Sequence, residues 1–83
     1  MDSGDVRERH IQALKLSFDG DHDASLRALE SLHMDFPDDV EVLFDLAMLQ
    51  MMLGKFEEAC TNLKSVLVRE PKHVKALQQV TYC

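Results

Sequence analysis

A spacing of 34 residues governs the turns of this 83-residue chain. Gly20 and Gly54 lie 34 positions apart, and so do Pro37 and Pro71. Glycine and proline are the strongest local punctuation of a backbone, so their spacing indicates where elements end. A fixed period of this length is typical of stacked repeat units, in which each unit packs mainly against its neighbours. We therefore expect one domain built as a short repeat stack.

The segments between these turns carry helical periodicity. Asp38 or Asp39 can cap a helix over about residues 40–53, which Gly54 would end in the left-handed conformation. A second helix runs to Pro71, and a third starts near residue 74. Residues spaced three and four apart predict the buried face of each helix. For the helix over 40–53 these are Leu43, Leu46, Ala47 and Gln50. For the helix that runs to Pro71 they are Phe56, Ala59, Cys60, Leu63, Val66 and Leu67.

This pattern resembles the tetratricopeptide repeat, a 34-residue helix–turn–helix unit. The matching positions of the second unit are Leu46-Ala47, Gly54-Lys55-Phe56, Ala59, Leu63, Val66 and Pro71. The first unit departs from the family pattern at Arg9, Gln12, His22 and Ser25. The resemblance implies an all-α fold, with two antiparallel helix–turn–helix units and one C-terminal helix in a short right-handed stack. The single domain would span 1–83, with repeat 1 at about 6–39, repeat 2 at about 40–73 and a capping helix at about 74–83.

Charge and cysteine content exclude several classes of partner. The formal net charge is −6 and aromatic residues make up 6% of the chain, whereas nucleic-acid and anionic-membrane binders need a basic surface. No apolar stretch approaches the ~20 residues that span a bilayer, and none follows Met1 as in a signal peptide. Two cysteines are too few for a disulfide framework. We therefore predict a cytoplasmic chain with reduced thiols, in which Cys60 is inert packing and Cys83 is the thiol that would oxidise between chains.

Two patterns could carry metal chemistry. Asp19, Asp21, Asp23 and Glu30 resemble an EF-hand calcium loop, but Ala24 stands where that loop needs glycine. The 34-residue repeat instead makes this segment the acidic first turn of a helix. The four histidines lack metal-ligand spacing and are interpreted as scattered surface residues. No metal, cofactor or catalytic constellation is predicted, so the chain is not expected to be an enzyme.

Apolar residues also lie off the core stripe of the helix over 40–53. Phe44, Met48 and Met51 recur at helical spacing, with Met52 beside them. A helix that is apolar nearly all round must be covered, either by its own chain or by a partner. The resemblance places this face in a concave groove that would bind a peptide or helix, with the following lining: Leu14, Phe18, Phe44, Met48, Met51, Met52, Lys75 and Tyr82.

The predicted function is a protein–protein interaction module of the adaptor, chaperone or scaffold type. Some family members clamp the terminal carboxylate of heat-shock chaperones with basic groove residues. The matching positions here are His10, Leu14, Asp45, Lys75 and Gln79. Asp45 would repel a carboxylate, so that activity is not carried over. Two alternatives remain open: self-association through the open helical ends of the stack, and a role as the recognition domain of a larger enzyme or complex.

Overall fold

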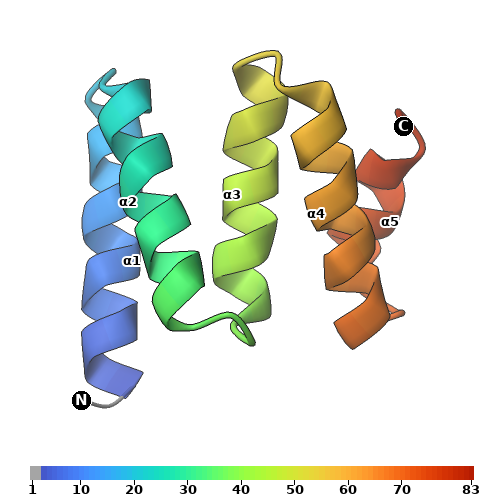
Figure 1. Cartoon of the computed structure of the whole chain (residues 1–83), viewed down its shortest axis with the longest axis horizontal. Helices are drawn as coiled ribbons and strands as arrows, with labels where there is room; N and C mark the ends of the chain where they lie inside the picture. The colour runs from blue at the N-terminus through green and yellow to red at the C-terminus, as the bar shows by residue number, and fades with distance from the viewer. Residues whose placement is uncertain (1–2) are drawn as a thin grey trace.

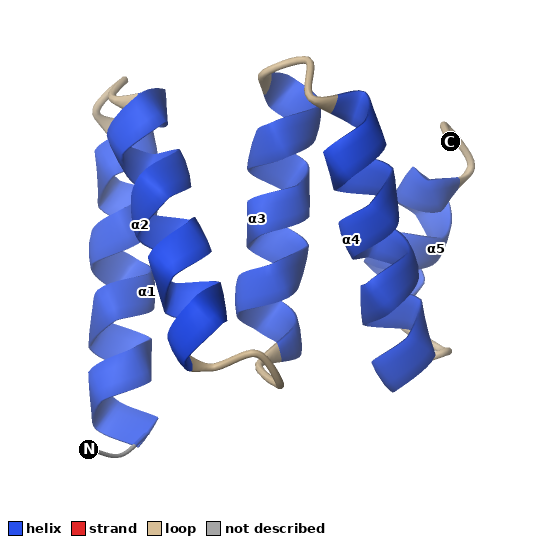
Figure 2. Cartoon of the chain, in the orientation of Figure 1, coloured by secondary structure: helices blue, strands red, loops and turns tan. Residues whose placement is uncertain are grey.

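The structure, a computed structural model, describes residues 3–83, with side chains from residue 6 onward. These residues form helices joined by short turns and loops (Figures 1 and 2). The helices are α1 (Ser3–Phe18), α2 (His22–Asp35), α3 (Val40–Met52), α4 (Phe56–Arg69) and α5 (Val74–Val80). Over residues 3–83 the structure contains no strand, so the predicted all-α fold is confirmed. Met1 and Asp2, at the start of the predicted domain, lie outside the described residues.

The helices form two hairpins and one added helix. Each helix packs against the next in the chain, from α1 on α2 to α4 on α5. In Figure 1, α2 and α4 lie nearer the viewer than α1 and α5, and α3 stands between the two pairs. The predicted arrangement of two helical hairpins plus a C-terminal helix is therefore confirmed. None of the described helices combines the length and the apolar character needed to cross a membrane.

One glycine makes the tight turn inside each of the two hairpins. Gly20 has a φ of 94° and Gly54 a φ of 82°, in the left-handed region that glycine enters without the steric cost of a Cβ atom. After α3 the Gly54 N–H donates to the Met51 carbonyl at 3.1 Å, and the Lys55 N–H donates to the Gln50 carbonyl at 2.8 Å. This is a Schellman motif, which satisfies the last carbonyls of a helix. The predicted left-handed end at Gly54 is confirmed.

Side chains cap α3 and α5 at equivalent positions of the repeat. The Asp39 carboxylate accepts a hydrogen bond from the Val42 N–H at 3.1 Å, which decides between the two aspartates predicted as the cap. His73 stands 34 residues later, and its Nδ1 accepts from the Ala76 N–H at 3.1 Å. Both caps satisfy a backbone donor that has no partner within its own helix.

The core lies on both sides of α3. As predicted, Leu43, Leu46, Ala47 and Gln50 are buried. The buried amide of Gln50 is satisfied, because its Oε1 accepts a 2.8 Å hydrogen bond from Asn62 on α4. One core cluster joins α3 to α4 and α5 through Leu43, Phe44, Ala47, Leu63, Val66 and Ala76. The other joins α3 to α1 and α2 through Ala13, Leu26, Leu29, Leu46 and Leu49.

Two phenylalanines differ from their predicted positions. Phe44, expected off the core stripe, is only 8% exposed and packs with Ala76 of α5 in the core. Its ring centroid lies 4.9 Å from that of His73. Phe56, expected on the buried face of α4, is 60% exposed. The reason is that His73 and Ala76 pack against Phe44, whereas residues 56–58 in the first turn of α4 are left exposed.

Candidate functional site

Three hollows bring side chains of α1, α3 and α5 together on one surface, which we name the groove face. The groove face comprises the exposed and half-buried side chains that α1, α3 and α5, together with Phe56 and Tyr82, contribute to these hollows. α3 reaches hollows on both of its sides because its apolar positions extend nearly all round the helix.

The first hollow lies between α1 and α3 and has a volume of about 320 Å³. Three residues predicted for the groove meet here: Leu14 is 42% exposed, Met52 is 59% exposed and Met48 is half-buried. The floor is formed by Ser25 and Leu29 of α2, both buried. Ser17, Asp45 and Leu49 complete the lining. The hollow therefore presents a largely apolar wall with one carboxylate.

The second hollow lies between α3 and α5 and is larger, at about 640 Å³. Met51, Phe56, Gln79 and Tyr82 line it. Met51 and Tyr82 were predicted for the groove, whereas Phe56 and Gln79 were not. Tyr82 is 78% exposed and Phe56 is 60% exposed, so this hollow is open to solvent between two aromatic side chains. Sequence reasoning missed Phe56 because helical periodicity assigned it to the core.

The third hollow, of about 310 Å³, lies where the N-terminal parts of α3 and α5 meet, and its lining includes the charged residues Glu41, Asp45 and Lys75. Its lining includes Lys75 and Phe44 from the predicted groove set, but Phe44 is a core residue with little exposed surface. Phe18, also predicted for the groove, is 94% exposed at the end of α1 and lines none of the three hollows. The predicted set is thus divided among three places rather than gathered in one channel.

A histidine–aspartate hydrogen bond crosses the groove face between α1 and α3. His10 Nε2 lies 2.7 Å from Asp45 Oδ2, with the histidine side chain 18% exposed and the aspartate 30% exposed. Asp45 lines both the first and the third hollow, so this pair stands between them. Asp45 was predicted only as a groove position that would repel a carboxylate, and the structure adds His10 as its partner. The pair fixes the spacing of α1 and α3 and still leaves a net negative group when His10 is neutral.

The histidines are not scattered over an exposed surface, and that prediction is corrected. All four are half-buried, and three of them make hydrogen bonds at helix junctions or caps. His22 Nδ1 lies 2.9 Å from Ser17 Oγ and joins α2 to α1. His10 joins α1 to α3, and His73 caps α5. Their positions at junctions explain why no metal-ligand spacing is visible along the chain.

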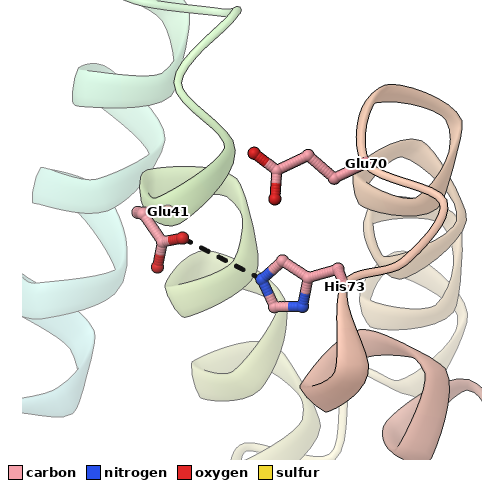
Figure 3. Close-up of side chains that lie close together, drawn as sticks. All are labelled: Glu41, Glu70 and His73. Atoms are coloured by element: carbon pink, nitrogen blue, oxygen red, sulfur yellow. Dashed lines mark ion pairs between the residues drawn. The ribbon is translucent and has the colours of Figure 1, made fainter.

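One histidine nevertheless lies in a group with metal-binding potential. Glu41, Glu70 and His73 place their ligand atoms within 4.8 Å of one another, with His73 Nε2 4.0 Å from Glu41 Oε2 (Figure 3). Sequence reasoning missed this group, because Glu41 lies 29 residues before Glu70 in the sequence and only the fold brings the two together. Carboxylates and imidazole are ligands that zinc accepts.

The hydrogen bonding of His73 disfavours metal ligation. Its Nδ1 accepts from the Ala76 N–H, so in the neutral ring the proton resides on Nε2. A protonated Nε2 donates toward Glu41 and has no free lone pair for a metal ion. Moving the proton to Nδ1 would set two N–H groups against each other and remove the cap of α5. The cluster is therefore assigned to the capping of α5.

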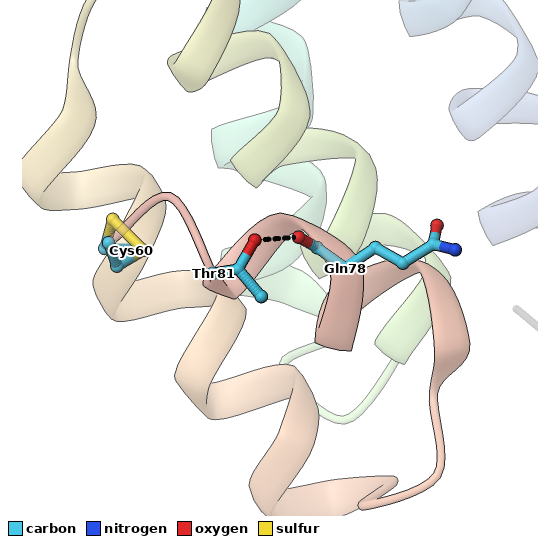
Figure 4. The surroundings of a disulfide bond; sticks show 4 residues. Cys60, Gln78 and Thr81 are labelled. Carbon is cyan, nitrogen blue, oxygen red and sulfur yellow. Dashed lines mark hydrogen bonds between the residues drawn. A yellow bond between two sulfur atoms is a disulfide. The ribbon is translucent and has the colours of Figure 1, made fainter.

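The two cysteines form a disulfide, which overturns the prediction of reduced thiols (Figure 4). Cys60 on α4 bonds to Cys83 at the C-terminus, with a Cα–Cα distance of 5.8 Å across 23 residues of sequence. Cys60 is half-buried rather than part of an inert core, and Cys83 pairs within its own chain rather than between chains. The bond was not predictable from spacing, because it depends on how α5 folds back against α4.

Of the residues that resemble a calcium loop, Asp21 caps α2, and Asp23 and Glu30 lie within it, as the repeat predicted. The Asp21 carboxylate accepts from the Ala24 N–H at 3.3 Å and caps α2. Glu30 lies within α2, two turns beyond the cap. The backbone therefore forms a helix where an EF-hand would continue as a loop.

Comparisons with known proteins agree with this geometry. A sequence model described as tetratricopeptide repeat matches residues 19–80, which is most of the chain. The matched span begins just before the first glycine turn and ends with α5. No curated protein sequence matches the chain.

Proposed function

Because the chain belongs to the tetratricopeptide repeat family, whose members generally mediate protein–protein interaction, we propose that its groove face binds a peptide segment of another protein. The observation that carries the proposal is the α1–α3 hollow. Leu14 and Met52 remain exposed there although the same helices bury a separate set of core residues. Exposed apolar side chains that gather in a hollow, rather than singly, are characteristic of binding surfaces.

The chemistry of the hollow favours an apolar segment with basic flanks. Met48 and Met52 are flexible and polarisable, so they adapt to a large aliphatic or aromatic side chain. Asp45 is the only charged residue in the lining of the hollow. Residues 1–53 carry 4 basic and 12 acidic groups, a net charge of −8. The electrostatic field of this negative charge attracts a basic segment and repels an acidic one. It affects mainly the orientation of the bound segment and its association rate.

Met52 is the residue at which the proposal is best tested. It is 59% exposed, whereas Met48 packs partly against the core. Peptides would be selected from a displayed library of random sequences on the immobilised chain, and their affinity measured for Met52→Glu. Met34 on α2 is 79% exposed and lines neither apolar hollow, so Met34→Glu is a matched control.

The proposal expects Met52→Glu to weaken binding about ten-fold or more, as charge insertion into an apolar contact does, and Met34→Glu to leave it unchanged. The selected peptides should be rich in aliphatic or aromatic residues with Lys or Arg beside them. Equal affinity of Met52→Glu and the parent chain would place the binding surface elsewhere. Both variants should unfold with the parent midpoint, which separates loss of contact from loss of fold.

A second candidate, end-to-end self-association, is supported by the two ends of the stack. Ile11 on α1 is 52% exposed, and on α5 Val74 is 64% and Leu77 45% exposed. Residues 54–83 carry 5 basic and 3 acidic groups, a net charge of +2, opposite to the rest of the chain. Sedimentation velocity tests this self-association. A mass that rises with protein concentration and falls with added salt supports self-association, and a constant monomer mass excludes it.

The cellular location belongs to the proposal as well. The cytoplasmic location was predicted together with reduced thiols, and the Cys60–Cys83 bond contradicts the reduced thiols. Disulfides persist in oxidising compartments and are usually transient in the cytosol. A cytoplasmic role of the oxidised chain therefore requires transient oxidation, which thiol trapping in intact cells would detect.

A further inference from the structure

α5 buries little apolar surface of its own. It has seven residues, and isolated helices of that length are unstable in water. Ala76 is its one buried residue, while Val74 is 64% and Leu77 45% exposed. Val80 packs against the core only in part. Because alanine contributes a single methyl group, burial alone holds α5 weakly against α4.

The disulfide supplies a covalent attachment at the far end of α5. The chain turns back after the helix: the Cys83 N–H donates to the Val80 carbonyl at 3.0 Å, and Thr81 Oγ1 donates to the Gln78 carbonyl at 2.7 Å (Figure 4). This turn brings Cys83 against Cys60 in α4. α5 is therefore fixed at one end by the loop after α4 and at the other by the bond.

The same bond holds together the α3–α5 hollow. Tyr82 directly precedes Cys83, and Phe56 lies four residues before Cys60, a spacing that places both side chains on one face of α4. Tyr82 and Phe56 are the two aromatic residues of the hollow. Tyr82 is 78% exposed, so packing does little to keep it in place. Without the bond, little packing keeps Tyr82 beside Phe56.

We propose that the Cys60–Cys83 disulfide is a redox latch on the groove face. In the oxidised chain, α5 and Tyr82 complete the α3–α5 hollow. In the reduced chain, α5 and the residues after it separate from α4 for much of the time, and the hollow loses one wall. The release of α5 is independent of any ligand, whereas its consequence for peptide binding rests on the proposed function above.

Opening the latch is a thiol–disulfide exchange with a dithiol. One thiolate of the dithiol attacks the Sγ of Cys83, which is the more exposed partner. The S–S bond breaks, and its electron pair leaves on the Sγ of Cys60, which takes up a proton. The second thiol then displaces Cys83 from the mixed disulfide. Overall the dithiol is oxidised to a disulfide by two electrons, and the two cysteines are reduced to thiols.

Hydrogen–deuterium exchange of the backbone amides tests the latch without a ligand. The full chain would be compared in its oxidised form and after reduction with dithiothreitol. A cross-link across 23 residues limits the conformations that the chain can adopt when α5 separates from α4. Removing it favours that separation and should raise the exchange rate of the amides of residues 77–80 by roughly a hundred-fold. Amides of α1 and α2 should change far less. The double variant Cys60→Ser/Cys83→Ser should exchange like the reduced chain and ignore dithiothreitol.

Two results of this experiment would overturn the latch. The first is equal exchange from α5 before and after reduction, and the second is a rise of the same size in α1 and α2, which would mean general loosening of the fold. A peptide selected on the oxidised chain then tests the consequence for binding. If α5 is released but affinity for the peptide is unchanged, the disulfide does not regulate the groove face. If no peptide is selected at all, the proposed function fails, and the exchange result still decides the latch.

Discussion

His10 Nε2 lies 2.7 Å from Asp45 Oδ2 and is the polar link between the first helices of the two repeats. Both side chains are partly shielded from water, at 18% and 30% exposure. A hydrogen bond to a charged acceptor in such surroundings contributes more than an exposed ion pair, on the order of 1 kcal/mol. The link also stands beside the hollow that we assign to binding, so it shapes the site as well as the fold.

The contribution of this pair can be isolated with a double-mutant cycle. His10→Ala and Asp45→Ala should each lower the free energy of unfolding, and the double variant should lose about 1 kcal/mol less than the sum. Urea denaturation of the four proteins gives the coupling energy. A coupling energy near zero would mean that the two groups do not interact in solution.

Replacing a turn glycine should destabilise the fold through the local backbone conformation alone. Gly20 and Gly54 have positive φ, and a Cβ atom added at either position would meet no other atom within 4 Å. Gly54→Ala should therefore cost about 1 kcal/mol through backbone strain and not through a clash. Gly54→Asn is the matched control and should cost less, since asparagine tolerates the left-handed region better. Equal losses for the two variants would contradict this account.

Phe44 and Met52 lie on the same helix, yet truncation to alanine should lower the stability of the fold strongly at Phe44 and hardly at all at Met52. Phe44→Ala empties a buried site in the core shared with α4 and α5 and should cost about 3 kcal/mol. Met52→Ala removes an exposed side chain and should change stability by less than about 0.5 kcal/mol. Thermal unfolding measures both, and Phe44→Leu, at a cost of about 1 kcal/mol, provides a folded variant if the alanine variant is too unstable. A large loss for Met52→Ala would show that it belongs to the core.

The disulfide predicts a specific mass and a specific loss of stability. Under oxidising conditions the intact chain should be a monomer two hydrogen atoms lighter than its reduced form, with no disulfide-linked dimer on a non-reducing gel. Reduction should lower the free energy of unfolding by about 3 kcal/mol, the contribution of a cross-link over a loop of this length. Cys83→Ser should show the reduced stability with or without a reductant. A dimer in place of the lighter monomer would restore the pairing between chains that the sequence suggested.

Features encoded locally were predictable from the sequence. The glycine turns, the Asp39 cap and the Leu43–Gln50 core stripe each depend on a few neighbouring residues, and the 34-residue period sets them in register. One departure of the first unit from the family pattern is explained by the packing of α2 against α1. Ser25 stands where the family prefers alanine, and its buried hydroxyl is satisfied because it donates a 2.7 Å hydrogen bond to the Ala13 carbonyl.

Features that depend on where α5 packs were not predictable. Phe44 is buried because Ala76 of α5 and His73, the cap of α5, pack against it, and periodicity along α3 carries no information about that contact. The disulfide depends on the turn after α5 in the same way. Of the predicted groove residues, Leu14, Met48 and Met52 share one hollow, whereas Phe18 stands apart. Spacing identifies the face of a helix, but a hollow is made by two or three helices together.

The methionine methyl groups offer the most direct measurement of where a peptide binds. Met48 and Met52 line the α1–α3 hollow, and Met34 on α2 is an exposed internal reference. A chain labelled with ¹³C at the methionine methyl groups would be titrated with a peptide selected on the parent chain, and the methyl spectrum followed. We expect the Met48 and Met52 signals to shift with saturation while the Met34 signal stays in place. A shift of Met34 with unchanged Met48 and Met52 signals would contradict binding at the groove face.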